Sequence, residues 1–393
     1  MNQLAKKNII FGVLVMAFFT PSVFFLMGLP MILQMKGFDP SIIGIFQILG
    51  LPMVIKFLLS PPVDKIVFKK NHYKKWIIFT GIFYVICLLG VSFVSLDNNI
   101  YLVFGVILFT TLISTFIDIP LNALAIKVFK PSERISAGSY KMSAFFAAGL
   151  LGGGVFLLIF NHLGWQNTFI LMALTVFVSL FALYFIQESS EKIEEQKVSL
   201  KTLISFFKQE NIGIWVFILM FYFSLISGVW VFIKPYLISK GITPDEVAFY
   251  VGVYGSIVGF ISGIIASFIG KHYSKKAILI LFGVFNLFST LILFIIEYFD
   301  MLNFIFLITI VTITSIATAF SSAIIFSLIM DYSRSSSKAI DYAIQSSLFS
   351  LSRIISAVIA GILVSSIGFG GMFLFEAIGI FFVIFIIYYF YKK

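Results

Sequence analysis

Six charged side chains lie within long apolar stretches of this sequence, where a charge is costly. A charged residue at the centre of a bilayer costs about 2.5–3.5 kcal/mol on insertion scales, so it faces a partner or a cavity. Four of the six are basic, which favours a cavity that accepts an anionic or carboxylate-bearing molecule. The six residues are Lys56, Asp118, Lys141, Lys234, Arg353 and Glu376.

Neutral polar residues accompany these charges. Asp118 and Asn122 are four residues apart and share one helical face, with the helix-loosening Pro120 between them. Protonation would switch Asp118 between a paired and a neutral state, which makes it our candidate for proton coupling. Trp230 precedes Lys234 by one helical turn. The candidate solute-binding residues are Lys56, Asp118, Asn122, Lys141, Trp230, Lys234, Gln345 and Arg353.

Each charge also has a purely structural explanation. Lys56 and Arg353 can extend to the membrane interface, with only their stems in the apolar layer. Asp118 can serve as an ion-pair partner of a neighbouring lysine without touching a solute. Lys234, before a proline near a span end, can lie at the interface, and Glu376 can reach outward. Trp76, Trp165 and Trp215 lie near span ends, where tryptophan is typical of interface anchors.

The elements that position these residues are transmembrane helices. The chain is 60% hydrophobic and only 11% charged, which places it in the membrane class. A spanning helix needs about 20 mostly apolar residues. Twelve segments qualify, the first being a retained span rather than a signal peptide. They are 9–35, 40–63, 76–96, 100–128, 134–160, 165–187, 211–238, 244–270, 276–297, 303–330, 338–367 and 369–391.

The connections are short except for one charged loop between the sixth and seventh spans. This loop predicts an N-terminal six-helix bundle over 1–187, a linker over 188–210 and a C-terminal bundle over 211–393. Lys and Arg collect in alternate loops, beginning with Lys6 and Lys7 and ending with Lys392 and Lys393. The positive-inside rule then predicts that both termini and the linker are cytoplasmic, in a bacterial inner membrane.

The two halves are related by an internal repeat. A shift of 204 residues places Gly37–Pro40 on Gly241–Pro244, Arg134 on Lys338, and Lys141 on Gln345. Six plus six spans with a cytoplasmic linker resemble the major facilitator fold, in which solute binds near the midplane and the halves rock to give alternating access. The expected fold is therefore all-α and integral to the membrane, with twelve helices in two pseudo-symmetric bundles.

Enzyme motifs are missing from the sequence. No P-loop or GxSxG elbow is present, and the histidines at 72, 162 and 272 lie in loops. One cysteine, Cys87, rules out a cysteine-based metal site. We expect no catalytic residues, cofactor, metal or nucleic-acid partner, and an ion gradient rather than ATP as the driving force.

Local motifs resemble one branch of the major facilitator superfamily, the AmpG-like permeases. Leu51–Leu58 with Ser60–Lys65 resembles their "LPxxLKFLxxPxxD" signature, Asp118–Ala123 their "QDIxxDA" span, and Lys130–Arg134 their "xPxERG" loop. Two positions depart from the pattern, since Ile117 replaces Gln and Asn122 replaces the second Asp. The departure at 122 puts one coupling carboxylate in question. Within these motifs we assign gating roles to Asp64, Lys65 and Arg134.

The resemblance implies two solute classes. The branch includes anhydromuropeptide permeases, which are usually longer, and siderophore permeases of the rhizobactin and pyochelin type. Because this sequence has twelve spans, and because Lys234–Leu237 resembles the "KPFLV" segment of the siderophore group, we expect proton-coupled siderophore uptake by a functional monomer. The alternative is muropeptide import. Drug or metabolite export and a non-transporting membrane sensor come after these.

Overall fold

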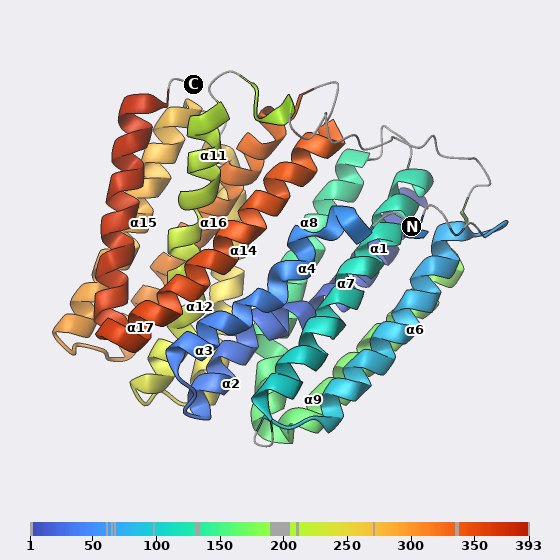
Figure 1. Ribbon diagram of the computed structural model, residues 1–393, viewed down its shortest axis with the longest axis horizontal. Helices are drawn as coiled ribbons and strands as arrows, with labels where there is room; N and C mark the ends of the chain where they lie inside the picture. The colour runs from blue at the N-terminus through green and yellow to red at the C-terminus, as the bar shows by residue number, and fades with distance from the viewer. Residues whose placement is uncertain are drawn as a thin grey trace. The chain divides into compact units, whose positions relative to one another are not determined.

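A computed structural model describes residues 3–59, 62–63, 66, 68–96, 99–129, 134–188, 205–209, 212–269, 272–334 and 338–391, and all regular structure in these ranges is helical (Figure 1). The helices form two compact units. Met1–Leu29 and Ile55–Glu195 make the first unit, and Pro30–Val54 and Gln196–Lys393 make the second.

The first unit contains long helices joined by short turns. Two of its chain segments include a π-helical turn, at η1 and η5. The elements are α1 Gln3–Val23, η1 Phe24–Gly28, η3 Lys56–Leu59, α6 His72–Phe93, α7 Ile100–Val128, α8 Arg134–Leu150, η5 Leu151–Val155, α9 Phe156–Leu180 and η6 Phe181–Phe185.

The second unit combines the chain after the linker with a segment from near the N-terminus, which begins within α2 Leu29–Met35. Its early elements are α3 Pro40–Ile45, η2 Phe46–Gly50 and α4 Leu51–Val54. Its later elements are α11 Ile212–Phe221, α12 Ser224–Ser239, α13 Pro244–Val247, η7 Ala248–Tyr254, α14 Gly255–Ile269, α15 Lys275–Tyr298, α16 Phe304–Asp331 and α17 Lys338–Phe390.

The prediction of twelve spans is confirmed for the described chain. Nine helical stretches are long and apolar enough to cross a membrane, and Pro40–Val54 adds a shorter one. Two of the nine are bent into two spans each by a glycine with positive φ, Gly164 (φ 75°) within α9 and Gly368 (φ 73°) within α17. Left-handed backbone is open to glycine at no steric cost, so these residues allow the chain to reverse without a longer loop.

The 204-residue repeat appears in the local backbone. Gly164 and Gly368 are separated by this offset, and so are Gly37 and Gly241, which also have positive φ. The side chain of Asn99 caps α7 by accepting hydrogen bonds from Tyr101 N and Leu102 N. Its repeat equivalent, Asn303, caps α16 by accepting a hydrogen bond from Phe306 N. The two halves therefore share the devices that start and turn their helices.

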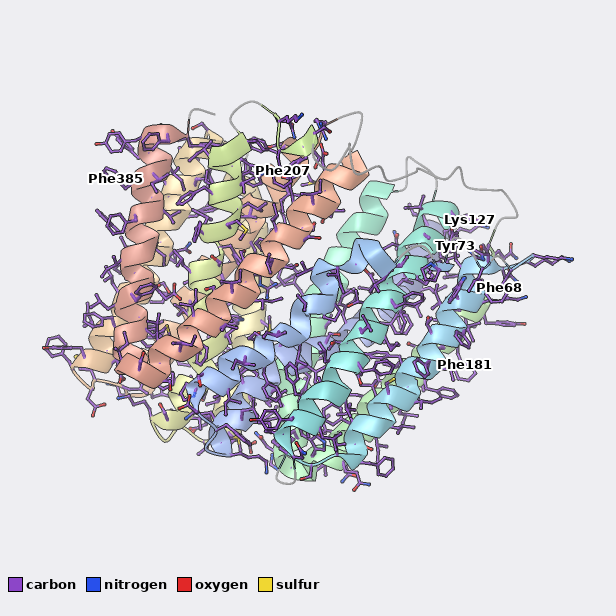
Figure 2. The ribbon with its side chains drawn as sticks, in the orientation of Figure 1. Phe68, Tyr73, Lys127, Phe181, Phe207 and Phe385 are labelled. Atoms are coloured by element: carbon purple, nitrogen blue, oxygen red, sulfur yellow. The ribbon has the colours of Figure 1, made fainter. Side chains whose placement is uncertain are left out.

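Large apolar side chains cover outward faces of the helices. Phe181 is 64% exposed and Phe385 is 49% exposed (Figure 2). Exposed apolar surface on this scale is typical of a membrane-facing surface. Near the end of α7, Lys127 lies 3.1 Å from Glu188 and above the ring of Tyr73. This basic residue of the first unit is thus held by an acid and an aromatic ring at a helix end.

Candidate functional site

The first unit gathers four of the sequence candidates into one polar cluster. Asp118 lies on α7, is buried, and forms an ion pair with Lys56 of η3. Its other carboxylate oxygen lies 3.7 Å from Nζ of Lys141, on α8. The carboxylate therefore lies between two ammonium groups that come from separate elements.

Asn122 positions one of these lysines. It lies one turn after Asp118 on α7, and its side-chain amide donates a hydrogen bond to the Asp118 carbonyl oxygen at 2.6 Å. The same side chain accepts a hydrogen bond from Lys141 Nζ at 2.5 Å. Pro120 lies between the two residues within α7, as the sequence predicts. A neutral amide here thus holds Lys141 beside Asp118 without a second negative charge.

The cluster has one positive charge more than it has negative charges. The Lys56 and Lys141 side chains are 34% and 33% exposed, whereas that of Asp118 is 9% exposed. The lysines can therefore be reached from outside the protein interior, while the carboxylate cannot. An accessible excess of positive charge suits an anion, and a carboxylate can take bidentate or bridging hydrogen bonds from two ammonium groups.

In the second unit, the candidate Gln345 lies in a network of hydrogen bonds between helices. Gln345 is fully buried, and its amide accepts from Trp215 Nε1 at 2.7 Å. The same amide donates to Ile329 O, Ser333 Oγ and Asp341 O at 3.0–3.1 Å. Because these bonds use both ends of the amide, Gln345 joins neighbouring helices in this conformation.

Trp215 also departs from its expected place. It is fully buried and stacks on Tyr332 with ring centroids 4.7 Å apart. The prediction that it anchors the membrane interface is therefore wrong. Position near a span end does not distinguish an indole that faces lipid from one that faces the interior, because that depends on which helices pack beside it.

The remaining second-unit candidates lie apart from this hydrogen-bonded group. The guanidinium of Arg353 lies above the rings of Phe223 and Phe349, at 5.8 and 5.9 Å from their centroids. Lys234 is buried on α12, and Trp230 of the same helix lies against Gly255. The contacts described among the sequence candidates are thus most extensive in the first unit.

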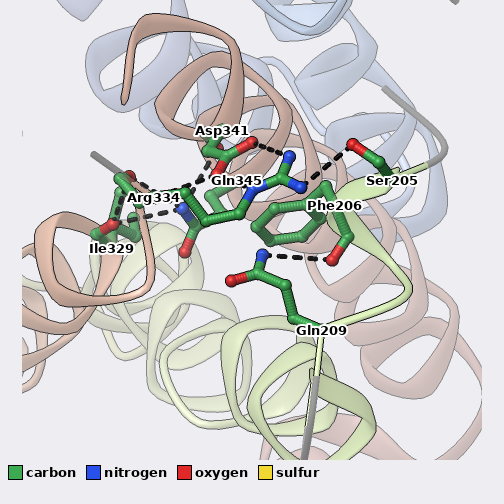
Figure 3. A network of polar contacts seen from close by, with 8 residues as sticks. Ser205, Phe206, Gln209, Ile329, Arg334, Asp341 and Gln345 are labelled. Atoms are coloured by element: carbon green, nitrogen blue, oxygen red, sulfur yellow. Dashed lines mark hydrogen bonds and ion pairs between the residues drawn. The ribbon is translucent and has the colours of Figure 1, made fainter. Parts of the chain in front are cut away.

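The gating candidates are only partly described. Asp64 and Lys65 lie outside the described residues, and for Arg134 the structure describes the backbone at the start of α8. The second unit also contains a polar network that was not predicted from the sequence. There Arg334 donates to both carboxylate oxygens of the buried Asp341, at 2.7–2.9 Å, and to Ser205 Oγ at 2.9 Å (Figure 3).

This network ties the end of the linker to the start of α17. Asp341 is fully buried and raises the pKa of the Arg334 guanidinium above its usual value. A charge pair seven residues apart across a loop is the signal that could have found it. Within the described ranges, no group of three or more His, Cys, Asp or Glu residues is arranged to hold a metal ion.

Comparison with known proteins identifies the family. The family model of the Major Facilitator Superfamily matches residues 9–340. This chain belongs to the Major Facilitator Superfamily. Its fold is similar to that of a D-xylose–proton symporter (TM-score 0.74, 12% identity, 99% of this chain and 98% of the other). It is also similar to the nucleoside transporter NupG (TM-score 0.71, 16% identity, 98% and 100%).

Relatives by sequence place the chain in the AmpG-like branch that the motifs resemble. It is 26% identical to a Rickettsia bellii protein named as transporter AmpG 1, over 86% of each chain. It is 25% identical to AmpG 3 of Rickettsia prowazekii, over 91% and 90%. The anhydromuropeptide permease of Escherichia coli is 21% identical over 88% of this chain and 71% of its own length. The protein is thus a multi-pass membrane transporter of the superfamily's AmpG kind.

Proposed function

We propose that this protein imports anhydromuropeptides across the bacterial inner membrane together with protons, by alternating access. The observation that carries the proposal is the pair of accessible lysines, Lys56 and Lys141, around one buried carboxylate, Asp118. A peptide-bearing cell-wall sugar ends in carboxylates, so it matches the excess positive charge of this cluster.

Proton coupling follows from competition for the two lysines. The Asp118 carboxylate lies within ion-pair distance of both ammonium groups, so in its ionised form it attracts both of them. A proton on Asp118 removes that negative charge and leaves both lysines without a counter-ion. A solute carboxylate then takes its place, so proton and anionic solute bind together. Loss of the proton on the opposite side of the membrane returns the lysines to Asp118 and weakens the hold on the solute.

The sequence motifs favour siderophore uptake, with muropeptide import as the alternative. The relatives support the alternative, muropeptide import. One relative is named an anhydromuropeptide permease and others share the AmpG name. Chain length does not argue against this, because this chain spans 86% of the Rickettsia bellii AmpG 1. The resemblance of Lys234–Leu237 to the "KPFLV" segment still favours siderophore uptake. Siderophore uptake is therefore measured as the second arm of the test.

The membrane arrangement is part of the proposal. The distribution of Lys and Arg supports cytoplasmic termini and a cytoplasmic linker. We also propose that the working protein is a monomer with an N-terminal bundle over 1–187, a linker over 188–210 and a C-terminal bundle over 211–393.

The test is uptake by a deletion strain that carries the gene on a plasmid. Cells receive labelled anhydromuropeptide or an iron-loaded carboxylate siderophore, each with and without a protonophore. We expect protonophore-sensitive uptake of muropeptide only. Lys141→Met should abolish this uptake, while the matched variant Lys240→Met, whose lysine pairs with Glu297 and Asp300, should leave it intact. Uptake of siderophore alone would overturn the assignment of the solute.

The role of Asp118 is tested in proteoliposomes. Asp118→Asn imitates the protonated state, so exchange of labelled for unlabelled solute should continue while accumulation driven by a proton gradient is lost. Gradient-driven accumulation at the wild-type level would show that Asp118 does not couple protons.

A further inference from the structure

A second acidic residue lies inside the other unit, and none of the described residues forms an ion pair with it. Glu376 lies on the arm of α17 that follows the break at Gly368 and is 1% exposed. Its carboxyl makes no hydrogen bond or ion pair with any residue that the structure describes, and its Oε2 is fully enclosed. The alternative explanation, in which Glu376 reaches outward, therefore does not hold. The residue that the 204-residue repeat places at this position in the first unit is the apolar Met172.

Space for the carboxyl is created by a glycine on the neighbouring helix. A methyl group at Gly228 of α12 would lie 2.8 Å from Glu376 Oε1 and 3.0 Å from Ser356 Oγ. Ser356, on the first arm of α17, donates its hydroxyl hydrogen bond to the carbonyl oxygen of Ser224 at 2.7 Å. The acid thus occupies a small polar-edged space between α12 and the two arms of α17.

The cations that the structure describes on the neighbouring helices do not pair with this acid. The charged groups on the helices packed against it have other surroundings: Arg353 lies above two phenylalanine rings and Lys276 above the ring of Tyr388. The helix α12 also carries Lys234. On α15, Lys275 pairs with Asp331, and Glu297 pairs with Lys240. None of these groups forms an ion pair with Glu376 in the described structure.

An isolated ionised carboxylate in apolar surroundings is so unfavourable that such a group takes up a proton instead. We propose that Glu376 is a proton-binding site of the second unit. It is neutral in this conformation and releases its proton when a rearrangement of α12 and α17 admits water. A role of Glu376 in transport rests on the proton coupling proposed above. The protonation of Glu376 in this conformation does not depend on that proposal.

Infrared difference spectroscopy on the purified protein in lipid tests protonation without any solute. Wild type at neutral pH should show the carbonyl stretch of a protonated carboxylic acid, and this band should be missing in Glu376→Gln. The matched variant Glu246→Gln, whose acid caps α13 at an exposed position, should keep the band. If Glu376→Gln does not fold, isotope labelling of glutamate in the wild-type protein should shift the band. A spectrum without a glutamate-derived carbonyl band would overturn the proposal.

A transport experiment separates this proposal from the proposed function. In proteoliposomes, Glu376→Gln should keep exchange of labelled anhydromuropeptide and lose accumulation above equilibrium under a proton gradient. Unchanged accumulation would show that the Glu376 proton takes no part in coupling. If the wild-type protein moves no muropeptide, the proposed function fails, and the infrared result still decides whether Glu376 holds a proton.

Discussion

Replacement of Asp118 by Asn tests the central ion-pair cluster, because it keeps the shape of the side chain and removes only its charge. The Lys141 Nζ–Asp118 Oδ1 distance is 3.7 Å. At an effective dielectric constant of about 20, two unit charges at this separation attract by about 4–5 kcal/mol. The cost of burying Asp118 offsets much of this attraction. Water also screens the two lysines, whose side chains are 34% and 33% exposed.

We therefore expect a net coupling between Asp118 and Lys141 of about 1–3 kcal/mol, measured by a double-mutant cycle. The cycle combines Asp118→Asn with Lys141→Met and follows denaturant unfolding in detergent micelles. The control is the pair of Asp300 and Lys240, which are 2.8 Å apart with the Asp300 side chain 81% exposed. Because water and salt screen this exposed pair, we expect its coupling to be clearly smaller than that of Asp118 and Lys141.

The two cycles together can refute the reasoning. If Asp118→Asn and Lys141→Met are additive within about 0.3–0.5 kcal/mol, the two side chains do not interact in the membrane protein. A coupling no larger than that of the exposed control pair would show that burial of Asp118 does not strengthen the interaction. Either outcome would also remove the physical basis for the proposed competition between Asp118 and the solute.

Three further predictions concern the second unit. A methyl group at Gly361 of α17 would lie 2.5 Å from the carbonyl oxygen of Pro40, so Gly361→Ala should destabilise the folded protein by about 1–3 kcal/mol in detergent unfolding. Gln345→Leu leaves the buried Trp215 indole N–H without an acceptor and should cost about 1–3 kcal/mol in the same assay. Hydrogen bonds from Ser41 and then Ser365 hold the pKa of the Asp39 carboxyl below its usual value. Its contribution to stability should therefore be complete above pH of about 4 and lost at lower pH, as the carboxyl is protonated, and Asp39→Asn should remove this dependence.

The membrane class, the span count and the repeat could all be predicted from the sequence, because they depend on local properties. Apolar runs of spanning length identify helices whatever their neighbours are. Glycine and asparagine at turns and caps act within a few residues, which is why the 204-residue offset of Gly164 and Gly368 reappears in the backbone. Asp118 and Asn122 could be placed on one helical face for the same reason.

The partners of the charged residues were decided by tertiary packing. Lys56, Asp118 and Lys141 come from three separate elements, and sequence left open which lysine would meet the carboxylate; the structure brings both to it. The amide of Gln345 and the carboxyl of Glu376 look alike in sequence, as polar groups within apolar runs. One is fully hydrogen-bonded and the other has no described partner, because only the helices packed beside a residue supply its donors and counter-ions.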